Sequence, residues 1–238
     1  TIAVGQFPQG VVYDSGKGEV FVANLESNNV SVISDINNSV VTSIGVGAFP
    51  TGIAYSSERG EIYVTNDGSS NVSVISDSNN SVVTSIQVTG ALEGLAYDAA
   101  RSELFVADSS SDSVGVVSLK TDRVVATIPV GSSPQGVAYD SWSGGVFVTN
   151  LGGSRVSVIS AMTNRVQENL QVGSAPYGVV FDANNGQVYV TNSLQGTVSM
   201  ISPSHSAISD HLAASIEPSA LVGWSVAIPL WSSEPRRL

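Results

Sequence analysis

The stretch Tyr63-Val64-Thr65-Asn66 decides the fold, because close copies of it recur along the chain at a constant spacing. The other copies begin at Phe21, Phe105, Phe147 and Tyr189, so each aromatic residue stands 42 residues from the next. Five copies in one register, with no insertion between them, identify a repeat protein whose unit is 42 residues long.

Three further motifs keep the same spacing. A proline stands two residues before a glycine in each unit, except that Leu92 replaces the proline in the third unit. Versions of Val-Ser-Val-Ile-Ser begin at Val30, Val72, Val114, Val156 and Val198, and versions of Val-Val-Thr-Ser-Ile begin at Val40, Val82 and Val124. Clusters of Gly, Asn, Asp and Ser, which accept turn geometries, separate these apolar segments. Each unit is therefore predicted to hold four short strands.

A repeat of about 40 residues with four strands is typical of a propeller blade. We predict an all-β fold, a β-propeller of four-stranded antiparallel blades, in a single domain over 1–238. The regular repeats are expected at 6–47, 48–89, 90–131, 132–173 and 174–215. The composition agrees with many short strands and polar turns, since 42% of the residues are hydrophobic, 12% are charged and 23 are glycine.

The two ends of the chain are expected to close the ring together. Residues 1–5 align with Ser43–Gly47 and are expected to form an outermost closing strand that lacks its own blade. Residues 216–238 are interpreted as a degenerate last unit, in which Pro218 matches Pro176. This gives five regular blades and an incomplete sixth, with a five-bladed ring or a fragment of a larger propeller as the alternatives.

The Tyr-Val-Thr-Asn units, together with Pro-x-Gly-Val-Ala-Tyr-Asp and Val-Ser-Val-Ile, resemble the YVTN family of β-propeller repeats. That family is best known from archaeal surface-layer proteins, and the resemblance covers about residues 1–202. It implies a propeller fold and an extracellular or cell-surface location in a prokaryote, in particular an archaeon. The family is functionally broad and includes relatives of propeller lactonases, so the resemblance by itself names no reaction.

The negative net charge of the chain disfavours anionic partners. A formal charge of −11 would repel a phosphate backbone or an anionic bilayer, so we expect neither nucleic acid nor membrane as a partner. The apolar stretch from Leu212 to Trp231 has about the length of a membrane span, but Glu217 and Pro229 interrupt it. Other surface proteins, glycans or further copies of the chain are the partners we expect.

The repeat register predicts one binding face. In a propeller, the loops between blades and the loops between second and third strands emerge on the same side, around the central channel. The residue between proline and glycine varies from unit to unit, and Asp67 and Asp108 follow the second strands. The candidate ligand-binding residues on this channel face are Gln9, Thr51, Glu93, Asp108, Gln135 and Tyr177.

The residues for catalysis are few. The chain has no cysteine, and its two histidines, His205 and His211, both follow the last clear repeat motif, so neither a cysteine nucleophile nor a His-rich metal site can be assembled. We expect no catalytic residue, no cofactor and no dedicated metal site. Calcium is the alternative, because turn carboxylates, amides and carbonyls are hard oxygen donors.

Four Asn-x-Ser sequons are candidate glycosylation sites if the chain is exported. They stand at Asn29, Asn37, Asn71 and Asn79, again in pairs 42 residues apart, so duplication of Asn-rich turns explains them equally.

The leading hypothesis for function is a non-catalytic extracellular or cell-surface scaffold that mediates structural or adhesive contacts. The alternatives are a propeller that binds a small molecule, carbohydrate or metal on its channel face, and a lactonase-like hydrolase.

Overall fold

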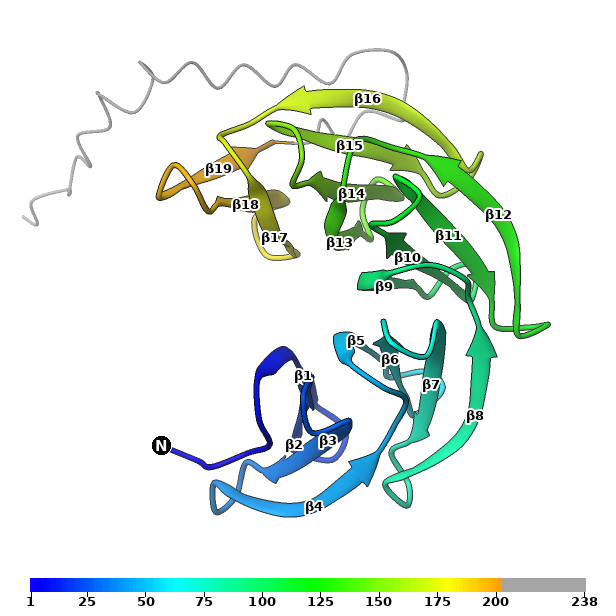
Figure 1. Cartoon of the computed structure of the whole chain (residues 1–238), viewed down its shortest axis with the longest axis vertical. Helices are drawn as coiled ribbons and strands as arrows, with labels where there is room; N and C mark the ends of the chain where they lie inside the picture. Colours follow the sequence, from blue (N-terminus) through cyan, green and yellow to red (C-terminus); the bar gives the residue numbers. More distant parts are fainter. Residues whose placement is uncertain (203–238) are drawn as a thin grey trace, which may run out of the picture.

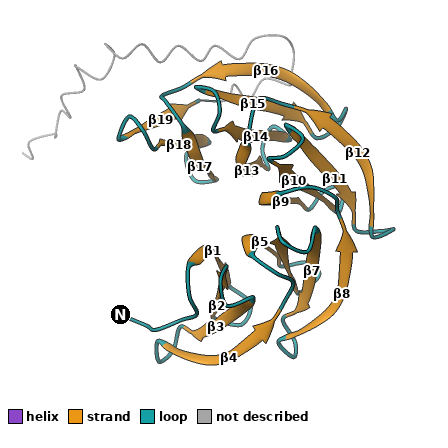
Figure 2. Ribbon diagram, viewed as in Figure 1, coloured by secondary structure: helices purple, strands orange, loops and turns teal. Residues whose placement is uncertain are grey.

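Strands and turns form the whole of the described fold (Figures 1 and 2). The computed structural model describes residues 1–202, and the expected degenerate unit at 216–238 and the stretch Leu212–Trp231 lie outside them. Within residues 1–202 there is no helix, and therefore none long and apolar enough to cross a membrane.

The strands fall into five antiparallel sheets in chain order. The first two sheets contain β1 (Pro8–Asp14), β2 (Glu19–Asn24), β3 (Asn29–Ser34) and β4 (Ser39–Gly45), then β5 (Pro50–Ser56), β6 (Glu61–Asn66), β7 (Asn71–Ser76) and β8 (Ser81–Gln87). The third and fourth contain β9 (Leu92–Asp98), β10 (Glu103–Asp108), β11 (Ser113–Ser118) and β12 (Arg123–Pro129), then β13 (Pro134–Asp140), β14 (Gly145–Asn150), β15 (Arg155–Ser160) and β16 (Arg165–Gln171). The fifth contains β17 (Pro176–Asp182), β18 (Gln187–Asn192) and β19 (Thr197–Ile201) within the described residues.

The predicted propeller fold is confirmed. The five sheets follow one another around a common centre, with β1, β5, β9, β13 and β17 innermost and β4, β8, β12 and β16 on the outside (Figure 1). The strands begin and end where the repeat places them, because turn residues separate the apolar segments at a constant offset.

The hydrophobic core lies between neighbouring blades. Each of four apolar clusters joins side chains of one sheet to side chains of the next. The repeated aromatic residues Phe21, Tyr63 and Phe105 are fully buried, as predicted. Burial of such a side chain contributes about 1.5 to 3 kcal/mol. Stability therefore accumulates at each contact between blades.

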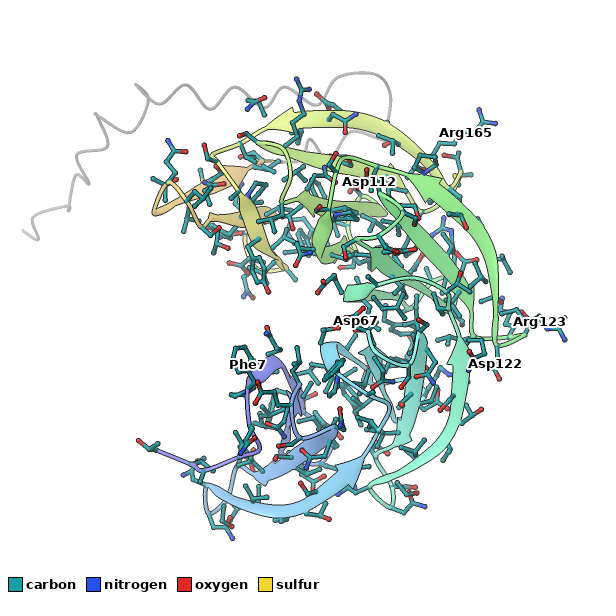
Figure 3. The ribbon with its side chains drawn as sticks, viewed as in Figure 1. Phe7, Asp67, Asp112, Asp122, Arg123 and Arg165 are labelled. Atoms are coloured by element: carbon teal, nitrogen blue, oxygen red, sulfur yellow. The ribbon has the colours of Figure 1, made fainter. Side chains whose placement is uncertain are left out.

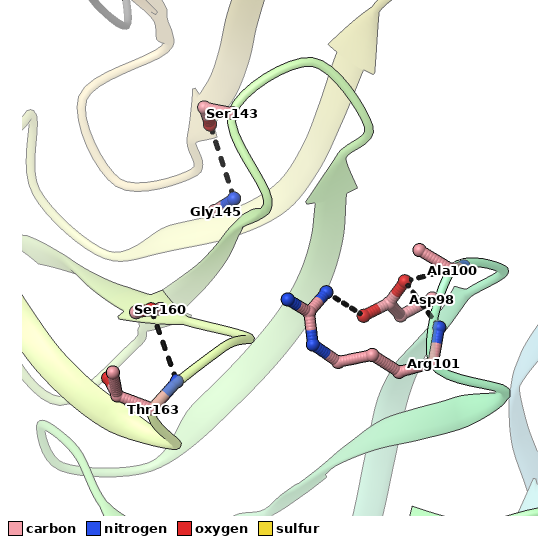
Figure 4. Close-up of polar contacts among 7 residues, drawn as sticks. All are labelled: Asp98, Ala100, Arg101, Ser143, Gly145, Ser160 and Thr163. Atoms are coloured by element: carbon pink, nitrogen blue, oxygen red, sulfur yellow. Dashed lines mark hydrogen bonds and ion pairs between the residues drawn. The ribbon is translucent and has the colours of Figure 1, made fainter. Parts of the chain in front are cut away.

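The tight turns are held by side chains at the strand ends (Figure 4). Asp98 Oδ1 accepts hydrogen bonds from the backbone N–H groups of Ala100 and Arg101, and its Oδ2 lies 3.1 Å from the Arg101 guanidinium. The hydroxyls of Ser143 and Ser160 accept from backbone N–H groups two and three residues further on. These bonds are the reason that Asp and Ser recur at these places.

The expected closing strand is not present in the described structure. Residues 1–5 belong to no strand, and β1 begins at Pro8. The next residues pair with the loop after β2, where Leu25 N–H donates to the Phe7 carbonyl, as Asp67 N–H does to the Phe49 carbonyl in the second blade. Closure of the ring by a strand from the N-terminal segment and a unit at 216–238 therefore stays a prediction.

Candidate functional site at the channel end

A bulge in every innermost strand positions the residues predicted to face the channel. In all four blades that begin with Pro-x-Gly, the proline pairs with the last residue of the second strand, and the next two residues have no partner in the pairing. Glu93 and Gly94 take the same place in the third blade. Such bulges redirect side chains away from the sheet.

Hydrogen bonds from the preceding blade fix the backbone at the third-blade bulge. Thr65 Oγ1 donates to the Glu93 carbonyl at 2.6 Å and accepts from Gly52 N–H at 2.8 Å. Thr51 Oγ1 donates to the Leu92 carbonyl at 2.8 Å. The threonine of the repeat motif thus joins two blades at the position where Glu93 projects. Thr149 repeats this contact, donating to the Tyr177 carbonyl at 2.6 Å.

Four side chains, one from the same blade and three from other blades, interact with the Glu93 carboxyl. Ser109 Oγ lies 3.5 Å from Glu93 Oε1, the Gln135 amide favours the charged form of the carboxyl and so lowers its pKa, and Asp67 adds a nearby negative charge. Tyr177, two blades further on, is close enough for the charge on Glu93 to affect its phenol. We call Asp67, Glu93, Ser109, Gln135 and Tyr177 the channel-end cluster. Figure 3 shows Asp67 on the inner side of the arc, whereas Arg123 and Arg165 lie on its outer turns.

The surroundings of the cluster raise the pKa values of two of its members, Glu93 and Tyr177. Burial raises the pKa of the Glu93 carboxyl above its usual range; Asp67 raises it further, while the Gln135 amide and Ser109 hydroxyl partly oppose the rise. Burial, followed by the negative charge of Glu93, raises the pKa of the Tyr177 phenol. A carboxyl flanked by an amide, a hydroxyl and a phenol offers hydrogen-bond donors and acceptors to a polar ligand.

The other predicted site residues have different surroundings. Thr51 holds the backbone of the third blade, and Gln9 is exposed at the first blade. The Asp108 carboxylate accepts from the Ala91 and Ser110 N–H groups and from two serine hydroxyls, and none of these bonds involves the channel-end cluster. Glu93, Gln135 and Tyr177 are therefore brought together, and Asp108 has its own set of partners.

Two exposed aromatic residues were not anticipated from the sequence. Phe7 is 59% exposed and Phe49 is 48% exposed, and both carry positive φ angles in the loops that precede the prolines. Asp67 N–H donates to the Phe49 carbonyl, which places this loop beside the one that carries Asp67. A comparison of the repeats could have identified these two residues. The corresponding residues in the other blades are the small Ala91, Ser133 and Ala175.

The sequons differ in accessibility. Asn37 and Asn79 are exposed in turns, where they bond only to Ser39 and Ser81 nearby. Asn29 and Asn71 are partly buried, and their Oδ1 atoms accept from the amides of Asn24 and Asn66 at 2.8 Å. A glycan would thus be accommodated at the first pair without disturbing contacts between strands. Glycosylation itself stays a prediction.

Acidic residues do not gather into a metal cluster in the described part of the chain. Residues 1–202 contain no group of three or more His, Cys, Asp or Glu side chains placed to hold an ion.

Comparison with known proteins supports the fold alone. No family model and no curated protein sequence matches the chain. Among solved structures, hydrazine synthase of Kuenenia stuttgartiensis matches with a TM-score of 0.69 and 18% identity, over 85% of this chain and 68% of that one. A functionally unknown protein from Desulfotomaculum acetoxidans matches with a TM-score of 0.70 and 16% identity, over 84% of this chain and 70% of that one. Identities this low carry no function from one propeller to another.

Proposed function

We propose that this chain is a non-catalytic propeller scaffold, extracellular or at the cell surface, which makes structural or adhesive contacts through its outer edge. The observation that carries the proposal is a repeated apolar edge. β4, β8 and β12 are the last strands of their sheets, and each exposes two adjacent valines. We call these residues the valine rim: Val40, Val41, Val82, Val83, Val124 and Val125.

The valine rim has the properties of a contact surface. Val41, Val83 and Val125 are 50%, 54% and 53% exposed, although valine is normally buried. The three edge strands follow one another on the outside of the arc (Figure 1). An edge strand also presents unpaired backbone groups that another strand can extend. Several copies of this chain would thus meet the same surface on successive blades.

Sedimentation velocity over a range of concentrations tests this proposal. We expect the unmodified chain to associate with increasing concentration, and the triple variant Val41→Lys, Val83→Lys, Val125→Lys to lose that association, because lysine on an edge strand opposes pairing. The matched control carries Ser15→Lys, Ser57→Lys and Ala99→Lys, which add the same charge at exposed, equivalent turns of the same blades. A chain that stays monomeric throughout, or a control that dissociates equally, would contradict the proposal. The resemblance to surface-layer repeats agrees with such a role.

The channel-end cluster supports a second candidate, the binding of a small polar ligand such as a carbohydrate. The supporting observation is the convergence of Glu93, Gln135 and Tyr177 from three blades. A ligand that binds only the native state raises the melting temperature. In a thermal-shift screen of sugars, divalent metals and lactones, we expect a saturable shift that Glu93→Gln removes and Gln87→Ala, on the exposed end of β8, retains. A shift that survives Glu93→Gln would count against this site.

A further inference from the structure

The third blade departs from the repeat at one compact place. In the other four blades, an asparagine ends the second strand and its Nδ2 donates to a serine on the third strand, as Asn66 does to Ser73 at 2.9 Å. The same bond joins Asn24 to Ser31, Asn150 to Ser157 and Asn192 to Ser199. In the third blade the corresponding residues are Asp108 and Gly115, so the bond cannot form.

The loop that covers this place is altered as well. In the other blades a glycine packs against the asparagine, and a Cβ added to Gly47 would lie 2.7 Å from the Asn66 side chain. The third blade has Thr89 in that place and moves the glycine to Gly90, whose φ is +123°. A Cβ on Gly90 would collide with the Asp108 carboxylate, so only glycine allows this approach.

These changes leave a recess between the third blade and the segment that connects β8 to β9. Its volume is about 280 Å³, and it is lined by Val88, Thr89, Asp108, Ser111, Ser113, Gly115, Val124 and Thr127. Asp108, Ser113 and Val88 are buried in it, whereas Thr89, Ser111 and Thr127 are exposed at its rim. A Cβ on Gly115 would have only Val88 Cγ1, at 3.7 Å, and the Val106 carbonyl oxygen, at 3.9 Å, within 4 Å. The volume that a serine side chain fills in the other blades is therefore empty at Gly115 and forms part of the recess.

Asp108 provides the recess with a negative charge. Burial opposes ionisation, but the hydroxyls of Ser111 and Ser110 and the N–H groups of Ser110 and Ala91 outweigh it, so the pKa of Asp108 lies below its usual value. Among the described residues, the ion pairs are Arg59–Glu61 and Arg101–Asp98, and Asp108 takes part in neither. Its Oδ1 accepts three bonds, whereas Oδ2 accepts one, from Ser111. Oδ2 thus retains capacity for another donor.

We propose that this recess binds a small organic cation, a protonated primary amine on a short apolar stem, with Asp108 as its counter-charge. The ammonium group supplies the donors that Oδ2 and the hydroxyls of Ser113 and Thr127 can accept. The side chains of Val88 and Val124 contact the stem. A bare ion would leave most of the volume unfilled, and the net charge of −11 attracts cations to the molecule.

Amide NMR spectra of the whole chain, titrated with n-butylammonium chloride, test the proposal. We expect saturable shifts of the Gly115 and Asp108 amide signals, and no comparable shifts with n-butanol, which has the same stem without the charge. Asp108→Asn and Gly115→Ser each restore the residue that other blades carry, so both should fold and should weaken binding at least ten-fold.

Asp112→Asn is the matched control. It removes one negative charge four residues from Asp108, and Asn28 already fills the equivalent position in the first blade, where its Oδ1 accepts from a backbone N–H as Asp112 Oδ1 does. We expect this variant to bind as the unmodified chain does. The absence of saturable shifts, equal shifts with n-butanol, or undiminished binding by Gly115→Ser or Asp108→Asn would overturn the proposal.

Discussion

In the first four blades, the glycine two residues after the proline, or after Leu92 in the third blade, is needed because the next blade approaches closely at that residue. A Cβ on Gly94 would lie 2.5 Å from the Gln135 carbonyl oxygen, and one on Gly52 would lie 2.6 Å from that of Glu93. These neighbours are backbone atoms, so they cannot rotate away. The glycine is thus explained by the contact between blades, which no local turn propensity would have shown.

Gly94→Ala is expected to destabilise the chain by about 1 to 3 kcal/mol, because the added methyl group forces two innermost strands apart. Gly153→Ala is the control, since nothing lies within 4 Å of a Cβ there. It should change the free energy of unfolding by no more than about 0.5 kcal/mol. Urea unfolding followed by circular dichroism measures both, and equal effects would show that the close approach is not limiting.

The raised pKa of Glu93 predicts how its contribution to stability depends on pH. A carboxyl whose pKa is higher in the folded state favours folding fully below its unfolded pKa, about 4.3, and loses that contribution as pH rises through the folded value. Relative to Glu93→Gln, the unmodified chain should therefore lose stability between about pH 4 and neutral pH. Urea unfolding of both proteins across this range tests the sign. A constant difference would show that the carboxyl is not perturbed.

At the scale of the elements, the repeat predicted the strands, and side chains at the strand ends explain where they stop. Asp140, the fully buried last residue of β13, shows the principle. Its Oδ1 accepts from Trp142 N–H at 2.8 Å and its Oδ2 accepts from the Ser143 hydroxyl at 2.6 Å. The strand can end here because the Asp140 carboxylate accepts hydrogen bonds from turn residues that have no partner strand.

Asp140→Ala is expected to cost about 1 to 3 kcal/mol, because partly buried donors of the turn lose their acceptor. Glu58→Ala, at an exposed position in the corresponding turn of the second blade, should be close to neutral. Thermal unfolding of the two variants, monitored at one protein concentration, gives the comparison. A neutral Asp140→Ala would mean that water satisfies the turn.

At the scale of the whole molecule, the faces at the two ends of the arc differ from all inner faces. Val11 and Tyr13 on the first blade are 66% and 50% exposed, and Val198 and Met200 on the fifth are 56% and 51% exposed. Val156, which holds the place of Val198 one repeat earlier, is fully buried. The same sequence position is thus core or surface according to whether another blade covers it.

Val156→Ala should therefore cost about 2 kcal/mol or more, from two lost methyl groups and the cavity that they leave. Val198→Ala should cost no more than about 0.5 kcal/mol. Chemical unfolding of both variants in the full chain measures the two changes in the free energy of unfolding. Equal costs would contradict the exposure of the fifth blade's outer face and would indicate that something covers it.

The sequence by itself determined the repeat length, the propeller fold, the positions of the strands and the buried aromatic residues. It could do so because the constant period of 42 residues means that a strand or turn recognised in one unit can be placed in every other unit. It also pointed to Glu93, Gln135 and Tyr177, since these vary where their neighbours repeat. The role of residues 1–5 in closing the ring stays a prediction, because their alignment with Ser43–Gly47 carries no information on what they pair with.

Only the tertiary structure decided which of these side chains meet. The repeat places Glu93 and Asp108 on the same face of the third blade. In the structure, Glu93 interacts with Gln135 of the next blade, whereas Asp108 accepts hydrogen bonds from its own loop and from Ala91. The recess beside Gly115 depends on how the segment that connects β8 to β9 packs against the third blade. Such contacts join residues from different repeats, and their geometry depends on how the sheets stack around the centre.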